Sequence, residues 1–107
     1  MNKYVFKFVS WDATPEETIK ETRYYKIIEK LENGEKLTRL EKDSIHSLNG
    51  IIKQGGWMFD FRPFMKTYLV KDEYYGWREL FAFDKTSLRN NYDDCKSHIL
   101  RIVELGD

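Results

Sequence analysis

The 107-residue sequence has a single cysteine, Cys95, so no disulfide can form within the chain. A protein that folds without disulfides is typical of a reducing compartment, and we expect a cytoplasmic location. Long apolar runs are lacking as well. The first eleven residues contain Lys7 within too short an apolar run for a signal peptide, and no stretch is long enough to span a bilayer. These absences predict a protein that makes no membrane contact.

An excess of either charge is also missing. The 18 basic residues balance the 18 acidic residues, and the two signs are mixed along the chain. A block of basic residues is the usual sequence trace of an electrostatic nucleic-acid arm or a membrane-surface helix. The balance disfavours nucleic-acid binding without excluding it, because folding can gather lysine and arginine on one side.

Motifs of catalysis are absent from the sequence. It contains no nucleophile elbow, no phosphate-binding glycine loop and no dinucleotide fingerprint. The carboxylate pairs Glu16–Glu17 and Asp72–Glu73 are explained by a helix start and by a turn. Catalysis requires reactive groups that converge on one site. We therefore predict a protein that is not an enzyme, with no catalytic residues and no cofactor.

One group of residues offers metal-ligand chemistry: Asp93, Asp94, Cys95 and His98. Zinc accepts these ligand types, but structural zinc sites usually have four Cys or His ligands, and this group supplies only half of such a set. We favour the interpretation that Cys95 packs as a small apolar residue and that the carboxylates lie in a turn. The sequence therefore predicts no metal site.

Residues 3–10 alternate as a strand does, which predicts that Tyr4, Phe6 and Phe8 face the core. Residues 14–17 form a Thr-Pro-Glu-Glu helix start, and Gly34 ends that first helix. Thr38 begins a second helix that we expect to span residues 39–53, because Gly55–Gly56 follow as a stop signal.

Ten of the seventeen aromatic residues lie between Gly56 and Phe83. This part of the chain predicts, in order, a short strand over residues 57–61, a break at Arg62–Pro63, a strand over 64–71, a turn over 72–76, a strand over 77–83, an Asp84-capped helix over 85–92 and a last strand over 98–105.

These elements predict a small single α+β domain over residues 1–107. Their order is β-α-α-(β)-β-β-α-β, with residues 57–61 as the bracketed strand. We expect a four- or five-stranded, mostly antiparallel sheet packed by a helical hairpin and a short third helix. The passage from residue 77 to residue 105 has the order of a parallel strand–helix–strand crossover.

The aromatic stretch favours a binding surface, because Trp, Tyr, Met and Arg are the residues enriched at interface hot spots. We predict a non-enzymatic protein that docks on a protein or nucleoprotein complex and regulates or inhibits it. A second copy of the chain would also fit such a surface. The predicted contact residues are Arg62, Lys66, Tyr74, Tyr75, Trp77 and Arg78.

Two other interpretations of this stretch stay open. Its rings could form only the core and outer face of the sheet, since aromatic residues favour strands. Rings interleaved with cations could instead stack single-stranded bases, and the residues concerned are Phe64, Lys66, Tyr68, Tyr74, Tyr75, Trp77 and Arg78. A single-stranded nucleic-acid-binding module that uses an aromatic sheet face is thus the alternative function.

A small, neutral, cysteine-poor α+β chain resembles the accessory proteins of phages and mobile elements, which include inhibitors of host defence such as anti-CRISPR proteins. The resemblance is one of size and composition. It implies inhibition of a larger complex and assigns no site residues.

Overall fold

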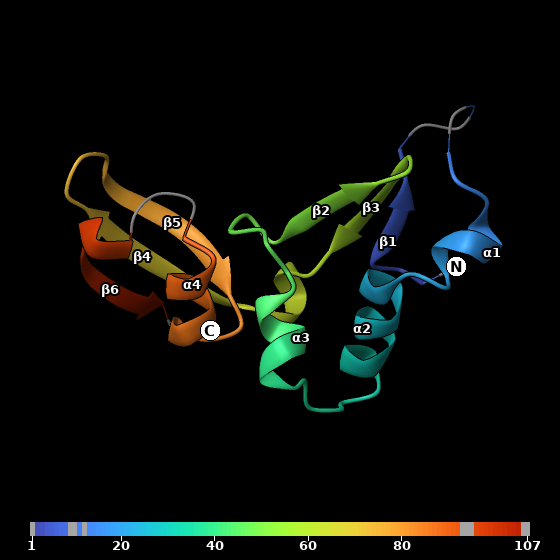
Figure 1. Ribbon diagram of the computed structural model, residues 1–107, viewed down its shortest axis with the longest axis horizontal. Helices are drawn as coiled ribbons and strands as arrows, with labels where there is room; N and C mark the ends of the chain where they lie inside the picture. The colour runs from blue at the N-terminus through green and yellow to red at the C-terminus, as the bar shows by residue number, and fades with distance from the viewer. Residues whose placement is uncertain (1, 9–10, 12, 93–95, 106–107) are drawn as a thin grey trace. The chain divides into compact units, whose positions relative to one another are not determined.

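A computed structural model describes residues 2–8, 11, 13–92 and 96–105 (Figure 1). These residues form a small α+β protein with two three-stranded antiparallel sheets. The predicted fold class is confirmed, but the prediction of a single four- or five-stranded sheet is wrong in this detail. The chain divides into two compact units: an N-terminal unit of residues 1–45 and 51–61, and a C-terminal unit of residues 46–50 and 62–107. The prediction of a single domain stays a prediction.

The N-terminal unit has helix α2 (Arg23–Glu32) packed against one face of its sheet. Its elements are β1 (Val5–Lys7), α1 (Glu16–Ile19), α2 (Arg23–Glu32), α3 (Arg39–Asp43), β2 (Ile51–Gln54) and β3 (Trp57–Asp60). Strand β3 is central, and β1 and β2 pair with it on either side. Val5, Trp57 and Phe59 are buried on one face, and the Tyr24 ring of α2 packs 5.7 Å from the Phe59 ring. The strand predicted over residues 57–61 is therefore confirmed, with its rings in the core.

The predicted second helix starts where expected but ends early. Thr38 Oγ1 accepts a hydrogen bond from Glu41 N (3.1 Å), and a Glu41 carboxylate oxygen accepts one from Thr38 N (2.9 Å), which completes a capping box. Helix α3 then stops at Asp43, and residues 51–54 are strand β2. The prediction of a helix over residues 39–53 is therefore wrong beyond Asp43.

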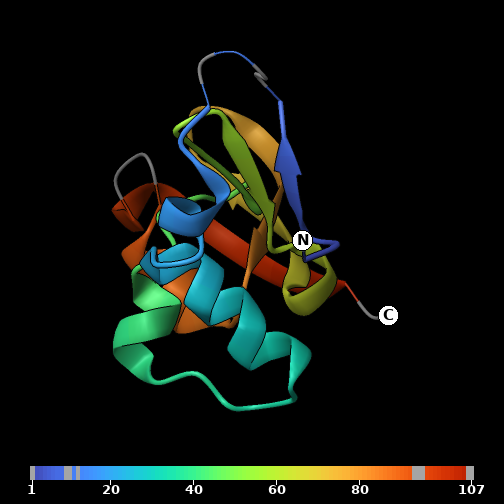
Figure 2. The ribbon, with the colours of Figure 1, turned by 90° about the vertical axis from the view of Figure 1, so that its right-hand side faces the viewer.

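The glycine pair that was interpreted as a helix stop is a hairpin turn. Gly55 and Gly56 have φ of +57° and +82°, and they join Gln54 to its register partner Trp57. Two central residues with positive φ fit the right-handed twist of paired strands, and this turn favours Gly-Gly. In both views the β2–β3 turn lies beside the segment that leads into α1 (Figures 1 and 2).

The first helix is broken, and its predicted cap is not formed. Pro15 precedes α1 without a side-chain cap hydrogen bond, and Thr22 caps α2 instead. The Thr14 backbone is instead hydrogen-bonded to the β2–β3 hairpin. Thr14 N donates to Gly55 O at 2.7 Å, and Thr14 O accepts from Trp57 Nε1 at 2.7 Å.

The predicted orientation of the first strand is wrong. Val5 is buried, whereas Phe6 and Phe8 are 47% and 46% exposed. Val5 pairs with the buried Phe59, so the period-two alternation of the strand turns both phenylalanines to the opposite face.

The C-terminal unit contains β4 (Lys66–Asp72), β5 (Gly76–Ala82), α4 (Lys85–Asn90) and β6 (Ile99–Leu105), with 3-10 turns at Arg62–Phe64 and Lys96–His98. The strand order is β5-β4-β6, with β4 antiparallel to both neighbours. Strands β5 and β6 therefore run in the same direction on either side of β4, as a crossover requires. The predicted cap is also confirmed, since Asp84 Oδ1 accepts from Ser87 N at 2.8 Å.

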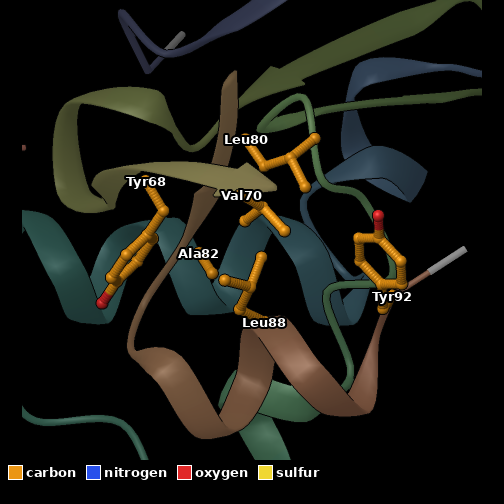
Figure 3. Close-up of a cluster of buried hydrophobic side chains, with 6 residues drawn as sticks. All are labelled: Tyr68, Val70, Leu80, Ala82, Leu88 and Tyr92. Atoms are coloured by element: carbon orange, nitrogen blue, oxygen red, sulfur yellow. The ribbon is translucent and has the colours of Figure 1, made fainter. Parts of the chain in front are cut away.

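The core of the C-terminal unit lies between its sheet and α4 (Figure 3). Leu88 of α4 is fully buried beneath residues from β4 and β5. The cluster consists of Tyr68, Val70, Leu80, Ala82, Leu88 and Tyr92. Because α4 covers this face, the alternate residues of each strand lie on the opposite side of the sheet.

Candidate binding surface

The turn between β4 and β5 is fixed by one buried carboxylate. Asp72 is only 2% exposed. Its Oδ1 accepts hydrogen bonds from Tyr74 N (2.7 Å) and Tyr75 N (3.1 Å), and its Oδ2 accepts one from the Tyr92 hydroxyl (2.5 Å). Gly76 completes the turn at φ +73°. An aspartate that binds backbone amides two and three residues ahead stabilises a turn in one conformation.

The same hydrogen bonds keep Asp72 ionised. The hydrogen bond from the Tyr92 hydroxyl is the largest cause that lowers the Asp72 pKa below its ordinary value of 3.8. The two turn amides and the nearby His98 lower this pKa further, whereas burial raises it. Burial is the main cause that raises the Tyr92 pKa, and its hydrogen bond to Asp72 adds to it. A charged carboxylate therefore anchors the turn at neutral pH.

The fixed turn carries three large exposed rings. Tyr74 and Tyr75 are each 68% exposed, and Trp77, the second residue of β5, is 51% exposed. The Tyr74 ring meets the His98 ring edge-on, with 4.6 Å between centroids, and Glu73 N donates to His98 O at 2.8 Å.

Exposed Leu100 lies near the start of β6, at the same end of the sheet, because Asp72 pairs with both Gly76 and Ile99. We call this set the hairpin-end surface: Tyr74, Tyr75, Trp77, His98 and Leu100.

Two cations lie beside the tryptophan. Trp77, Lys71 and Arg101 occupy directly opposite positions on β5, β4 and β6, so they share the sheet face away from α4. The Lys71 ammonium lies 5.9 Å from the Trp77 ring centroid, within the range of a cation–π contact. Like charges directly opposite each other lower the stability of a sheet, so the Lys71–Arg101 pair is a feature that the fold itself does not require.

Three of the six predicted contact residues lie together in the structure. Tyr74, Tyr75 and Trp77 lie together at the hairpin end. Arg78 follows Trp77 but points to the α4 side, where its guanidinium lies 5.4 Å from the Tyr92 ring centroid.

The other two predicted residues lie elsewhere in the C-terminal unit. Lys66 is at the opposite end of β4, six residues or about 20 Å from Asp72, and it pairs with Glu104 at 3.5 Å. Arg62 lies in the 3-10 turn before β4.

Four members of this region were missed by sequence reasoning: Lys71, His98, Leu100 and Arg101. Alternation already placed Lys71 on the face opposite Tyr68. Residues 98–101 come close to the β4–β5 turn only because β6 pairs with β4, and no local sequence pattern encodes this pairing.

The predicted nucleic-acid platform loses a central ring, because Tyr68 is buried in the core. Burial is the main cause that raises the pKa of Tyr68 to about 12. A fully covered ring cannot stack on a base, so the rings from Phe64 to Trp77 do not form one exposed face.

The described ranges contain no group of three or more His, Cys, Asp or Glu residues that could hold a metal ion. The candidate ligands Asp93, Asp94 and Cys95 lie outside the described residues. Within those same ranges, every helix is too short or too polar to cross a bilayer.

Comparison of the chain with protein-family models, with curated proteins and with solved structures finds no match in any of the three.

Proposed function

We propose that the protein is a non-enzymatic binding protein that docks its hairpin-end surface onto a larger protein or nucleoprotein complex and thereby regulates or inhibits it. The observation that carries the proposal is that the side chains of Tyr74, Tyr75 and Trp77 are each more than half exposed. They lie together in the fixed turn and at the start of β5. Trp and Tyr are the residues most enriched where alanine substitution weakens protein complexes.

The rigidity of the turn supports this function. The Asp72 carboxylate binds the amides of Tyr74 and Tyr75, so the backbone of both rings is ordered before a partner arrives. A surface that is already ordered loses less conformational entropy on association. Tyrosine and tryptophan add large contact area with only two side-chain torsions each.

The charges beside Trp77 indicate the chemistry of the partner. Lys71 and Arg101 repel each other across β4 and β6, and a carboxylate from the partner would relieve that repulsion. We therefore expect an apolar pocket flanked by Asp or Glu on the partner. Occlusion of that pocket would inhibit the complex, as expected for a chain whose size and composition resemble those of phage-encoded inhibitors.

Quantitative affinity capture tests the proposal. Tagged wild-type protein and the Tyr75→Ala/Trp77→Ala variant are compared as baits in a lysate of the cells that encode the protein. The control is Leu40→Ala, which removes an exposed apolar side chain from the other unit.

We expect a protein that is recovered with the wild type and with the control and is depleted at least about tenfold with Tyr75→Ala/Trp77→Ala, since each hot-spot ring contributes about 2 kcal/mol. Equal recovery by a folded Tyr75→Ala/Trp77→Ala variant would rule out this surface.

A further inference from the structure

We propose that the open face of the β1–β3–β2 sheet binds a single strand of nucleic acid. This surface belongs to the N-terminal unit and shares no residue with the hairpin-end surface. The proposal is therefore independent of the proposed function.

The open face is defined by the strand register. Val5, Phe59 and Ile52 form one cross-strand row on the core side, next to α2. The adjacent row must lie on the other side, because successive residues of a strand point to opposite faces. That row consists of Phe6, Met58 and Lys53.

Two exposed rings, Phe6 and Phe8, lie on this side of the sheet. Phe6 and Phe8 are both nearly half exposed and are two residues apart, which separates them by about 7 Å along the strand. The chain stays next to the sheet at this point, since Phe8 N donates to Gly56 O at 3.0 Å. Exposed rings on a sheet are platforms on which unpaired bases stack.

Lysines accompany the rings. The Lys53 ammonium lies 5.5 Å from the centroid of the Phe8 ring, and the Lys3 ammonium lies 5.2 Å from that of Tyr4. Alternation places Lys53 and Asp60 on the open face and Lys7 on the core side with Trp57, so the cations beside these rings are Lys53 and Lys3.

The two ammonium groups beside the rings indicate the occupant. Phosphates beside stacked bases complement Lys53 and Lys3, whereas a second copy of the face would bring its own lysines against them. Base faces and phosphates are common to DNA and RNA, so we expect recognition that does not depend on the sugar. The sequence predicted single-stranded nucleic-acid binding at residues 64–78. We now assign that binding to Phe6 and Phe8 instead.

Fluorescence anisotropy with labelled oligo(dT) and oligo(U) of about 12 nucleotides tests the proposal. We expect wild-type protein to bind both strands with affinities within a few-fold of each other and to prefer them to a duplex of the same length. The affinity should fall steeply between about 50 and about 200 mM salt.

Variants locate the site. Phe6→Ala/Phe8→Ala should weaken binding at least about tenfold, since the loss of stacking under one base alone gives such a change. Lys53→Gln should reduce the magnitude of the salt slope by about 0.7, the value for one phosphate contact on a single strand. Leu40→Ala, at an exposed apolar residue outside both surfaces, is the control and should bind as wild type does. Phe6→Leu/Phe8→Leu keeps apolar bulk in the strand but removes the rings, so it replaces the alanine variant if that variant does not fold.

Several results would overturn the proposal. They are no anisotropy change for either strand at low salt, binding of only one of the two sugars, full binding by folded Phe6→Leu/Phe8→Leu, or loss of binding in the control. Sedimentation that shows a wild-type dimer dissociated by Phe6→Leu/Phe8→Leu would instead assign the face to a second copy of the chain.

Discussion

Asp72 is the residue on which the hairpin-end surface depends. It is an acidic residue inside the protein, and its two oxygens are occupied by the Tyr92 hydroxyl and by the amides of Tyr74 and Tyr75. The sequence identified this position as the start of a turn. It did not reveal that Tyr92, twenty residues later, supplies the third hydrogen bond.

The pH dependence of the turn follows from the lowered pKa of Asp72. A carboxyl whose pKa is lower in the folded state stabilises the fold above its ordinary pKa, and this contribution is lost as the pH falls through the folded value. We expect the Tyr74 and Tyr75 amide resonances to be unchanged from pH 7 to about pH 5 and to titrate with a midpoint below the ordinary 3.8. An NMR titration measures this, and a midpoint at or above 3.8 would contradict the hydrogen-bonded arrangement.

Removal of the Tyr92 hydroxyl should weaken this arrangement. Tyr92→Phe keeps the ring in the core but leaves one oxygen of Asp72 without its donor, so we expect the free energy of unfolding to fall by about 1–2 kcal/mol. The Asp72 pKa should rise in the same variant. Tyr75→Phe is the control, because the exposed Tyr75 side chain should tolerate the change within about 0.5 kcal/mol. Equal stabilities for the two variants in urea denaturation would contradict the role of Tyr92.

At the scale of elements, local signals were predictable and pairings were not. The Thr38–Glu41 capping box, the Asp84 cap and Gly76 in the turn were all confirmed, because each is a contact or conformation within three or four residues. The Gly34 helix end was confirmed for the same reason: Gly34 N and Glu35 N donate to Leu31 O and Lys30 O. Short-range hydrogen bonds are encoded by residue types at fixed offsets.

The errors have one physical origin. Residues 51–54 have apolar residues compatible with a helix, and only pairing with β3 makes them a strand. Likewise, Tyr4, Phe6 and Phe8 alternate as well as Val5 and Lys7 do, and the face that is buried is decided by the register with Phe59. Register is a property of two segments, so alternation in one of them cannot determine it.

The Gly55–Gly56 turn gives a test at this scale. Gly56→Ala would place a Cβ 2.7 Å from Ala13 Cα, in addition to the strain of φ +82°. Gly34→Ala is the matched control, with φ +74° and no atom within 4 Å of the new Cβ. We expect a loss of about 1 kcal/mol for Gly34→Ala and at least about 1 kcal/mol more for Gly56→Ala, measured by urea denaturation. Similar losses would show that the Ala13 contact is unimportant.

At the scale of the whole molecule, two sets of exposed rings lie in different units. Tyr74, Tyr75 and Trp77 could be predicted to lie together, since four residues span them and a turn was expected. Their neighbours Leu100 and Arg101 could not, because only the pairing of β6 with β4 brings them to the hairpin end. The exposure of Phe6 and Phe8 was unpredictable for the same reason.

These rings should be dispensable for folding. We expect Tyr75→Ala/Trp77→Ala to retain the wild-type free energy of unfolding within about 1 kcal/mol, because both side chains are more than half exposed. Leu88→Ala, in the core of the same unit, should cost about 2–5 kcal/mol. Thermal and urea denaturation of the two variants measures the contrast. A loss for the surface variant as large as that for Leu88→Ala would mean that the rings serve the fold.

The most direct measurement is an NMR footprint of the captured partner on isotopically labelled protein. The central claim, that the hairpin end is the docking surface, predicts that the amide resonances most perturbed by the partner belong to residues 71–78 and 98–101. It also predicts that those of β1, β2 and β3 stay unchanged. Perturbations confined to the N-terminal unit, with the Tyr74 and Tyr75 amides unmoved at saturation, would contradict the claim.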